Sequence, residues 1–423
     1  MTVPSQPTSH GRSETSGSFP PSYSPEHPTL SHPRRPSVLP IRTSRPTLAA
    51  VALAVSLTAC SAQAADTSPE ARPAAPPAKV TVVDKAAGKP VTVTAAGGKL
   101  AAVKVTDAEG GALTGRTDAS GTRWTSDRKA APGTSYTVEV TAGGADGKET
   151  TTRSSFSTPD PEKVNKLTLA PGKNTTVGIA HPLSIVFDHP VTKKADVEKQ
   201  LKVTTSNDTE GSWGWVKDWS GRDRADWRPK EYWKPGTKVT LEADLNGTDS
   251  GGGWFVRDYA TGFTVGTAQV VKVDLDSHKL TVQQNGSTVR TIPVSGGTPG
   301  GDKRSWRGTA VLMAKEGTIN MNSETVGLGD AYDKMVDYSM RLTWSGMYAH
   351  AAPWNARYFG NANKSSGCIG MSDADAAALY ALVKPGDPFE IEGADTKGTV
   401  AEGNGYGAWN VSWADWKAKS ALG

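Results

Sequence analysis

Cys368 and His350 are the residues of this sequence best suited to covalent chemistry. They stand eighteen positions apart within the stretch GMYAHAAPWNARYFGNANKSSGCIGM, residues 346–371. A cysteine thiol is mostly protonated near neutral pH, so a cysteine nucleophile needs a partner base. The pair therefore indicates nucleophilic chemistry, with Cys368 as the nucleophile and His350 as its base.

The turn that ends at Cys368 suggests how an oxyanion would be stabilised. We expect Cys368 at the entry to a helix, where the peptide N–H groups of Ser366, Gly367 and Cys368 point at one spot. A lone cysteine is more often a small buried apolar residue. Here the histidine, the Ser-Gly-Cys turn and an export signal together favour the catalytic interpretation.

The elements that position this pair are mainly strands. Residues 269–296 read as two alternating strands joined by the hairpin signal Asn285-Gly286. Residues 318–339 are rich in Gly, Asn and Asp and predict an irregular lid or binding loop. The strand MRLTWSGMYAHA leads to His350, and Ser372 is predicted to cap a helix with the sequence AAALYALV. A last strand, PFEIEG, completes a catalytic domain at 268–394.

Two further modules precede it. Short strand-like runs broken by Gly turns predict β-sandwiches at 80–163 and 164–267. Trp124 and Trp227 each stand nine residues before a glycine, Gly133 and Gly236, that lies in a Pro-Gly-Thr sequence. This internal repeat indicates two related modules, so the predicted fold class is mainly β.

Tryptophans are dense in the second module and in the C-terminal tail. In the module we expect them to pack in the core, with an exposed platform for glycan as the alternative. In the tail, 395–423, Ser412 and Asp415 predict a helix cap, and Trp409, Trp413 and Trp416 are spaced to share one face. We expect this tail to pack on the catalytic domain.

The N-terminal residues 1–60 have the character of an export leader. The apolar run Thr47–Ala59 has 13 residues, too short to span a bilayer and suited to a signal peptide. It ends in Leu-Thr-Ala-Cys, which resembles a lipobox, so Cys60 is the predicted lipidation site. The alternative is a plain signal peptide cut near residues 62–65. Residues 61–79 are a Pro/Ala spacer.

Composition excludes several classes of function. The charge balance of 47 basic and 43 acidic residues gives no basic stretch that would follow nucleic acid phosphates. Two cysteines cannot form a disulfide framework. No metal-ligand spacing such as HExxH occurs, and no cofactor is expected.

The quoted residues resemble the L,D-transpeptidase family with a YkuD-type catalytic domain, whose pattern is a histidine followed by Ser/Thr-His-Gly-Cys. In this sequence fourteen residues separate His350 from Ser365-Ser366-Gly367-Cys368. The resemblance extends to the AAPW after His350, the VKPGD at 383–387 and the tail WNVSWADW. The two upstream modules resemble the immunoglobulin-like modules of actinobacterial cell-wall transpeptidases.

The resemblance implies acyl transfer on peptidoglycan stem peptides. Cys368 would attack a donor tetrapeptide and expel its terminal D-Ala, and an acceptor amine would resolve the thioester into a 3→3 crosslink. His350 would be the base, oriented by the carbonyl of Ala351. Tyr332, Met321 and Trp354 would line the substrate channel, and Ser365 and Gly370 would help to hold the stem. The enzyme would work outside the membrane, anchored by lipid on Cys60.

Three positions depart from the family pattern. Ser366 replaces its histidine, Gly370 replaces its Asn or Arg, and Ala351 replaces its Ser. Loss of the imidazole at Ser366 would raise the thiol pKa. Two alternatives follow. The first is a catalytically weakened wall-binding lipoprotein. The second is an acyl transferase that uses another acceptor, and so hydrolyses the tetrapeptide or anchors a protein.

Overall fold

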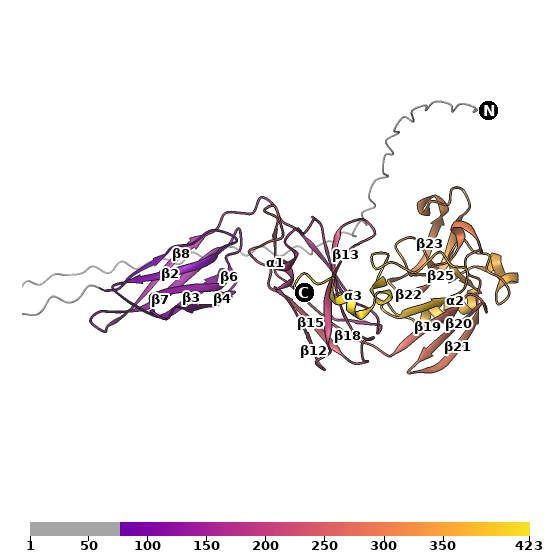
Figure 1. The fold of residues 1–423 in the computed structure, drawn as a ribbon, viewed down its shortest axis with the longest axis horizontal. Helices are drawn as coiled ribbons and strands as arrows, with labels where there is room; N and C mark the ends of the chain where they lie inside the picture. Colours follow the sequence, from indigo (N-terminus) through magenta and orange to yellow (C-terminus); the bar gives the residue numbers. More distant parts are fainter. Residues whose placement is uncertain (1–76) are drawn as a thin grey trace, which may run out of the picture. The chain divides into compact units, whose positions relative to one another are not determined.

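The structure, a computed structural model, describes residues 77–423. The predicted leader at 1–60, the lipidation site Cys60 and the spacer up to residue 76 lie outside the described residues. Figure 1 shows that strands greatly outnumber helices in the described part, which confirms the mainly β fold class. Residues 77–423 include no helix with the length and apolar character needed to cross a membrane.

Residues 79–157 form two four-stranded antiparallel sheets. Their strand orders are β1-β2-β6-β5 and β4-β3-β7-β8. Alternate residues of β7 point inward, as expected for strands that cover a core on one face, and Trp124 of β6 lies in that core. The strands are β1 (Lys79–Val82), β2 (Pro90–Ala96), β3 (Gly98–Asp107), β4 (Ala112–Leu113), β5 (Gly115–Thr117), β6 (Arg123–Lys129), β7 (Ser135–Gly144) and β8 (Glu149–Ser157).

Residues 167–265 form a second pair of four-stranded sheets. The orders are β10-β18-β15-β12 and β13-β14-β11-β9. The elements are β9 (Leu167–Ala170), β10 (Thr175–Val177), β11 (Leu183–Phe187), α1 (Lys194–Glu198), β12 (Leu201–Thr205), β13 (Gly211–Lys217), β14 (Asp223–Pro229), β15 (Lys238–Ala243), β16 (Thr248–Asp249), β17 (Phe255–Val256) and β18 (Tyr259–Val265).

The internal repeat has a structural basis in both pairs of sheets. Trp124 and Trp227 are buried core residues on β6 and β14. Gly133 and Gly236 have positive φ values of 60° and 79°, a conformation that glycine adopts without steric cost.

Four tryptophans of the second pair of sheets belong to its core, namely Trp213, Trp215, Trp227 and Trp233. The packing interpretation is confirmed for these four.

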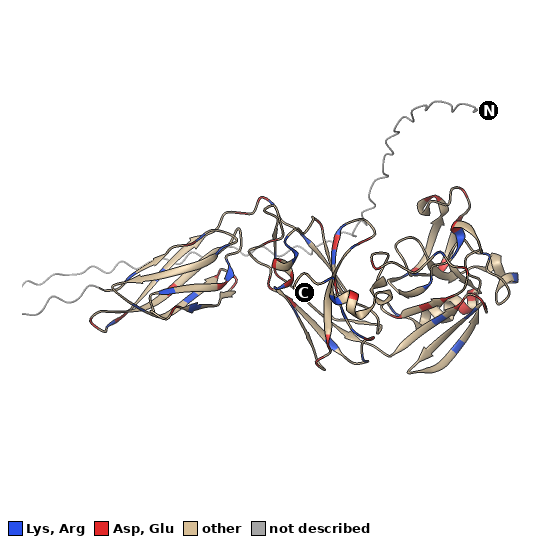
Figure 2. Cartoon of the chain, in the orientation of Figure 1, with Lys and Arg blue, Asp and Glu red and all other residues tan. Residues whose placement is uncertain are grey.

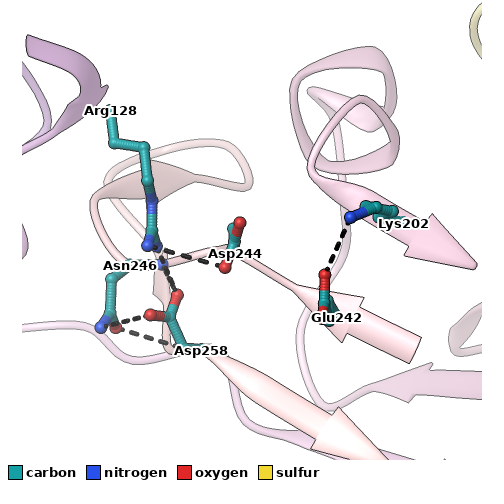
Figure 3. Close-up of polar contacts among 6 residues, drawn as sticks. All are labelled: Arg128, Lys202, Glu242, Asp244, Asn246 and Asp258. Atoms are coloured by element: carbon teal, nitrogen blue, oxygen red, sulfur yellow. Dashed lines mark hydrogen bonds and ion pairs between the residues drawn. The ribbon is translucent and has the colours of Figure 1, made fainter. Parts of the chain in front are cut away.

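Polar contacts connect the first pair of sheets to the second. Figure 3 shows that Arg128 of β6 reaches Asp258, with Nη2 2.8 Å from Oδ1, and lies 3.6 Å from Asp244. Asn246 donates to the same Asp258 carboxylate. Figure 2 shows Lys and Arg interspersed with Asp and Glu along strands and loops.

Residues 269–392 form a five-stranded sheet, β21-β20-β19-β27-β22, and a four-stranded sheet, β23-β24-β25-β26, which share one core. The elements are β19 (Gln269–Asp274), β20 (Lys279–Gln284), β21 (Ser287–Pro293), η1 (Gly301–Lys303), β22 (Gly308–Val311), β23 (Ala314–Asn322), η2 (Ser323–Val326), β24 (Asp333–Arg341), β25 (Tyr348–Ala351), η3 (Pro353–Tyr358), β26 (Ile369–Met371), α2 (Asp373–Leu382) and β27 (Pro388–Glu392).

Local signals in this region are confirmed. Asn285 and Gly286 both have positive φ and join β20 to β21 as a tight hairpin. The Ser372 hydroxyl accepts a hydrogen bond from the Asp375 N–H and caps α2.

Two predictions in the region are wrong. Residues 318–339 belong mostly to a hairpin, because β23 pairs with β24 and only 323–332 form the loop between them. Two register shifts interrupt that pairing, and they conceal the alternation of inward and outward residues in the sequence. The strand predicted at MRLTWSGMYAHA is two strands, β24 and β25, separated by a turn at Thr343–Gly346.

The C-terminal tail contacts more than the two sheets of residues 269–392. It contains η4 (Gly407–Asn410) and α3 (Trp413–Lys417), which Ser412 caps as predicted. The helix η4 lies against β22, but α3 lies against β13 of the second pair of sheets. The expectation that the whole tail packs on the catalytic domain is therefore wrong for α3. Its partner is a distant strand, which local sequence cannot reveal.

Trp416 is the buried centre of this contact. Its indole covers Gly214 so closely that a Cβ there would lie 2.6 Å from the ring, and its Nε1 donates to the Ser212 carbonyl at 3.1 Å. Because the side chain is fully buried, we expect Trp416→Ala to lower the free energy of unfolding by about 3–5 kcal/mol. Urea denaturation followed by circular dichroism would measure the change.

Trp219→Ala is the matched control, since Trp219 is 57% exposed. Its removal should change the free energy of unfolding by no more than about 0.5 kcal/mol. Equal stabilities for the two variants would contradict the burial argument for Trp416.

Candidate functional site

Cys368 and His350 come from neighbouring parallel segments. Strand β25 pairs with β26 so that His350 lies opposite Gly370, and Cys368 precedes Gly370 by two residues. Side chains two residues apart on a strand point to the same face. The pairing therefore turns the thiol and the imidazole toward the same space, a cavity of about 200 Å³ that both residues line.

This cavity also gathers most of the other predicted site residues. Met321, Tyr332, Trp354, Ser365 and Ser366 all line it. The remaining lining residues are Ala331, Lys334, Val336, Ala352, Asn355 and Lys364. A smaller cavity of about 30 Å³ shares Tyr332 and Ser366 and is lined in part by Gly367.

His350 is held in one orientation by the backbone. Its Nδ1 lies 2.7 Å from the carbonyl oxygen of Ala351, which is the hydrogen bond that the family resemblance implies. A carbonyl only accepts, so Nδ1 carries the proton and Nε2 is left as the basic nitrogen. Burial lowers the pKa of His350 below its usual value, partly opposed by the Ala351 hydrogen bond. The imidazole is therefore neutral near pH 7.

Cys368 is also buried and lines the same cavity as His350. Its thiol donates to the carbonyl of Gly346, with Sγ 3.6 Å from the oxygen. Burial raises the pKa of the thiol to about 11. The resting pair is thus a neutral thiol and a neutral imidazole, so forming the thiolate requires transfer of the proton to a base.

The turn before Cys368 is fixed by two serines. The Ser365 hydroxyl donates to the Cys368 carbonyl at 2.6 Å and accepts from the Gly367 N–H at 3.1 Å. The Ser305 hydroxyl donates to the Gly367 carbonyl at 2.8 Å. Gly367 itself has a φ of 119°, a conformation that side-chain-bearing residues rarely adopt.

Two expectations about this turn need correction. Cys368 does not enter a helix, because β26 follows it and α2 begins only at Asp373. The Gly367 N–H is already bonded to Ser365, so it is not a free oxyanion donor. Of the three predicted donors, the N–H groups of Ser366 and Cys368 remain candidates.

Gly370 does not line the cavity, contrary to the expected substrate contact. It is a buried residue of β26 whose N–H and carbonyl both bond to the backbone of Ser295. A Cβ at this position would lie 2.9 Å from the Cβ of Ala352. The glycine therefore matches the close approach of Ala352, and no side chain fits there without movement.

Tyr332 is fixed at the end of the loop between β23 and β24. Its backbone N–H and carbonyl both bond to Ser323, which is fully buried. Burial, followed by the proximity of Cys368, raises the pKa of the Tyr332 hydroxyl to about 12. The hydroxyl therefore stays protonated and can act as a donor in the cavity.

Sequence reasoning missed four residues that shape the site. Ser305 and Ser323 support the two walls through hydrogen bonds to backbone, and Lys334 and Lys364 line the cavity. Isolated serines and lysines carry no motif, and only the pairing of β23 with β24 places Lys334 here. Among residues 77–423, no three His, Cys, Asp or Glu side chains gather as metal ligands would.

Comparison with known proteins gives consistent matches. Residues 83–249 match the model of the bacterial Ig domain, and residues 268–391 match that of the L,D-transpeptidase catalytic domain. L,D-transpeptidase 2 of Mycobacterium tuberculosis is 33% identical over 358 residues, which cover 82% of this chain and 85% of the relative. L,D-transpeptidase 5 of the same species is 31% identical over 372 residues, 86% of this chain and 82% of the relative.

Solved structures match about half of this chain. A structure of an L,D-transpeptidase in complex with imipenem is 33% identical to this chain. It covers 55% of this chain and 100% of its own length, with a TM-score of 0.47.

Proposed function

Because the chain belongs to the L,D-transpeptidase family, we propose that Cys368 is the nucleophile and His350 the general base of its peptidoglycan crosslinking reaction. One observation carries the proposal: the thiol and a neutral imidazole with a free Nε2 line the same cavity. The substrates are a donor tetrapeptide stem and the amine of an acceptor stem.

In the first half-reaction, His350 Nε2 takes the thiol proton as Sγ attacks the donor carbonyl. The carbonyl carbon becomes tetrahedral, and the N–H groups of Ser366 and Cys368 stabilise its oxyanion. Collapse breaks the amide bond, and the imidazolium returns its proton to the departing D-Ala amine. The products are a Cys368 thioester and free D-Ala.

In the second half-reaction, the acceptor amine attacks the thioester while His350 removes a proton from the amine. Collapse expels the Cys368 thiolate, which recovers a proton from the imidazolium.

The proposal is tested by intact-mass spectrometry after exposure to a carbapenem or to a tetrapeptide stem. We expect the protein to gain the mass of one acyl group, and peptide mapping to locate it on Cys368. A protein that gains no mass from either reagent would favour the alternative of a wall-binding lipoprotein with weakened catalysis.

Ser366 offers a direct test of that alternative. Its side chain lines both cavities next to Cys368, so the substitution Ser366→His places an imidazole beside the thiol. Stabilisation of the thiolate should lower the thiol pKa from about 11 and speed acylation several-fold. Stopped-flow acylation by a carbapenem would measure the rate. The control Ser366→Asn adds a polar group that does not titrate and should give no such gain.

The proposal extends to the division of the chain. The pairs of sheets at 79–157 and 167–265 support Ig-like modules at 80–163 and 164–267, ahead of a catalytic domain at 268–394 and a tail at 395–423.

The signal-like run Thr47–Ala59 supports export, and the Cys60 that follows it supports a lipid anchor at the outer face of the membrane. Partition of the mature protein into detergent should be lost in Cys60→Ala, and partition that persists would contradict the anchor.

A further inference from the structure

We propose that Lys334 and Lys364 form a carboxylate-binding site in the Cys368 cavity, which selects donor stems by the free carboxylate of their terminal residue. The inference rests on the proposed function, since it assigns a role to these lysines in recognising the donor that Cys368 attacks. It adds a determinant of specificity that the family motif does not contain.

The first observation is the charge of the cavity wall. Two lysines line the cavity, and none of the described residues that line it is an Asp or Glu. The wall is therefore basic without a compensating carboxylate. A cavity of this kind favours an anionic ligand group over a neutral one of the same shape.

The second observation is the placement of Lys334. The residue lies on β24 opposite Met321 of β23, and Nζ is 4.7 Å from the centroid of the Trp354 ring. Trp354 in turn stacks on the imidazole of His350, with 6.1 Å between ring centroids. The cation–π contact therefore keeps the ammonium on the side of the cavity where the catalytic base lies.

The third observation is the backbone position of Lys364. Its N–H donates to the Ser295 hydroxyl at 3.0 Å, and the next N–H, of Ser365, donates to the Gly296 carbonyl at 2.9 Å. These bonds fix the residue four positions before Cys368. The two lysines thus reach the cavity from separate elements, the β23–β24 hairpin and the segment before the nucleophile.

Neither ammonium is neutralised by the protein. Across the described chain, residues 77–423, no ion pair involves Lys334 or Lys364. Lys384, by contrast, lies 3.7 Å from the buried carboxylate of Asp387. The two cavity lysines therefore retain their hydrogen-bond donors for a ligand, and an ammonium binds a carboxylate through short charge-assisted bonds.

The donor supplies a carboxylate at the required place. The residue expelled from a tetrapeptide stem is its last, so its carboxylate lies one residue beyond the bond that Cys368 breaks. Adjacent Cα atoms are about 3.8 Å apart, so the scissile carbonyl and this carboxylate fit in one cavity. The lysines would orient the leaving residue and raise the affinity for the donor.

The test compares two tetrapeptide donors that differ only at the C-terminus, one with a free carboxylate and one with a carboxamide. For each, kcat/KM of thioester formation is measured by quench and intact mass. We expect the wild type to prefer the carboxylate donor about tenfold, mostly through KM, as two partly solvent-screened ammonium contacts would give. Raising the salt concentration should reduce this preference.

The double variant Lys334→Gln/Lys364→Gln should bring the ratio of the two donors close to one. Lys279→Gln, at an exposed position of β20 outside the cavity, is the matched control and should keep the wild-type ratio. Equal use of both donors by the wild type, or a wild-type ratio in the double variant, would overturn the carboxylate site alone. Acylation by neither donor would overturn the roles of Cys368 and His350 together with this site.

Discussion

Cys368→Ala is expected to abolish acylation, with a loss of about 10⁴-fold or more in the rate of thioester formation. No other described residue of the cavity offers a thiol, because Cys368 is the one cysteine within residues 77–423. Removal of a covalent nucleophile eliminates the pathway rather than weakening it. Intact-mass spectrometry after carbapenem exposure should show the unmodified mass for this variant.

The structural cost of that substitution is small, so the result is interpretable. Alanine replaces a small buried side chain, and the Ser365 bond to the residue 368 carbonyl does not depend on the thiol. Ser287→Ala, at an exposed position of β21, is the control and should acylate like the wild type. An adduct that persists in Cys368→Ala would show that another group reacts and would overturn the assignment of the nucleophile.

His350→Asn should slow acylation by about 10³-fold while leaving the fold intact. The asparagine amide can replace Nδ1–H as donor to the Ala351 carbonyl, but it provides no base in place of Nε2. The expected loss lies within the range that general acid–base catalysis contributes. His278→Asn is the matched control, because His278 lies outside the cavity and has a positive φ that asparagine tolerates.

The pH dependence of the wild type follows from the two pKa shifts. Burial lowers the pKa of His350 below its usual value of about 6.5, so the free base is still present at pH 6.5 and is lost only at lower pH. The thiol pKa of about 11 keeps Cys368 protonated through neutral pH. The acylation rate should therefore increase with pH along an acid limb that lies below pH 6.5. Above that limb the rate should stay level to about pH 9.

A different profile would exclude this mechanism. If solvent rather than His350 removed the thiol proton, the rate would rise about tenfold per pH unit between pH 7 and pH 10, following the thiolate fraction. The acid limb should also disappear in His350→Asn. Its persistence in that variant would assign the titration to another group.

Local motifs predicted most of what is local in the structure. Asn285-Gly286 makes its hairpin, Ser372 caps α2, and the Ala351 carbonyl orients His350. In each case the residues that define the feature are neighbours in sequence. The pair Cys368 and His350 was also predicted, because the spacing of the family motif reflects the parallel pairing of β25 with β26.

Features that depend on distant contacts were not predicted. The hairpin at 314–341 reads as an irregular loop because its register shifts break the two-residue period. The partner of α3 is a strand some two hundred residues earlier in the chain. Lys334 and Lys364 are exposed lysines whose only distinction is the cavity they border, and that cavity exists only once the strands have paired.

The position of α3 on β13 has a consequence for biosynthesis. Glu198, the last residue of α1, is buried and accepts hydrogen bonds from Ser420 and from the Ala421 N–H, and Trp416 covers Gly214. These covering residues emerge from the ribosome only after the entire catalytic domain. The second pair of sheets therefore cannot reach its final packing during its own synthesis. In a truncated or stalled chain, the Glu198 carboxylate and the apolar strand β13 lack their cover and are accessible to proteases and chaperones.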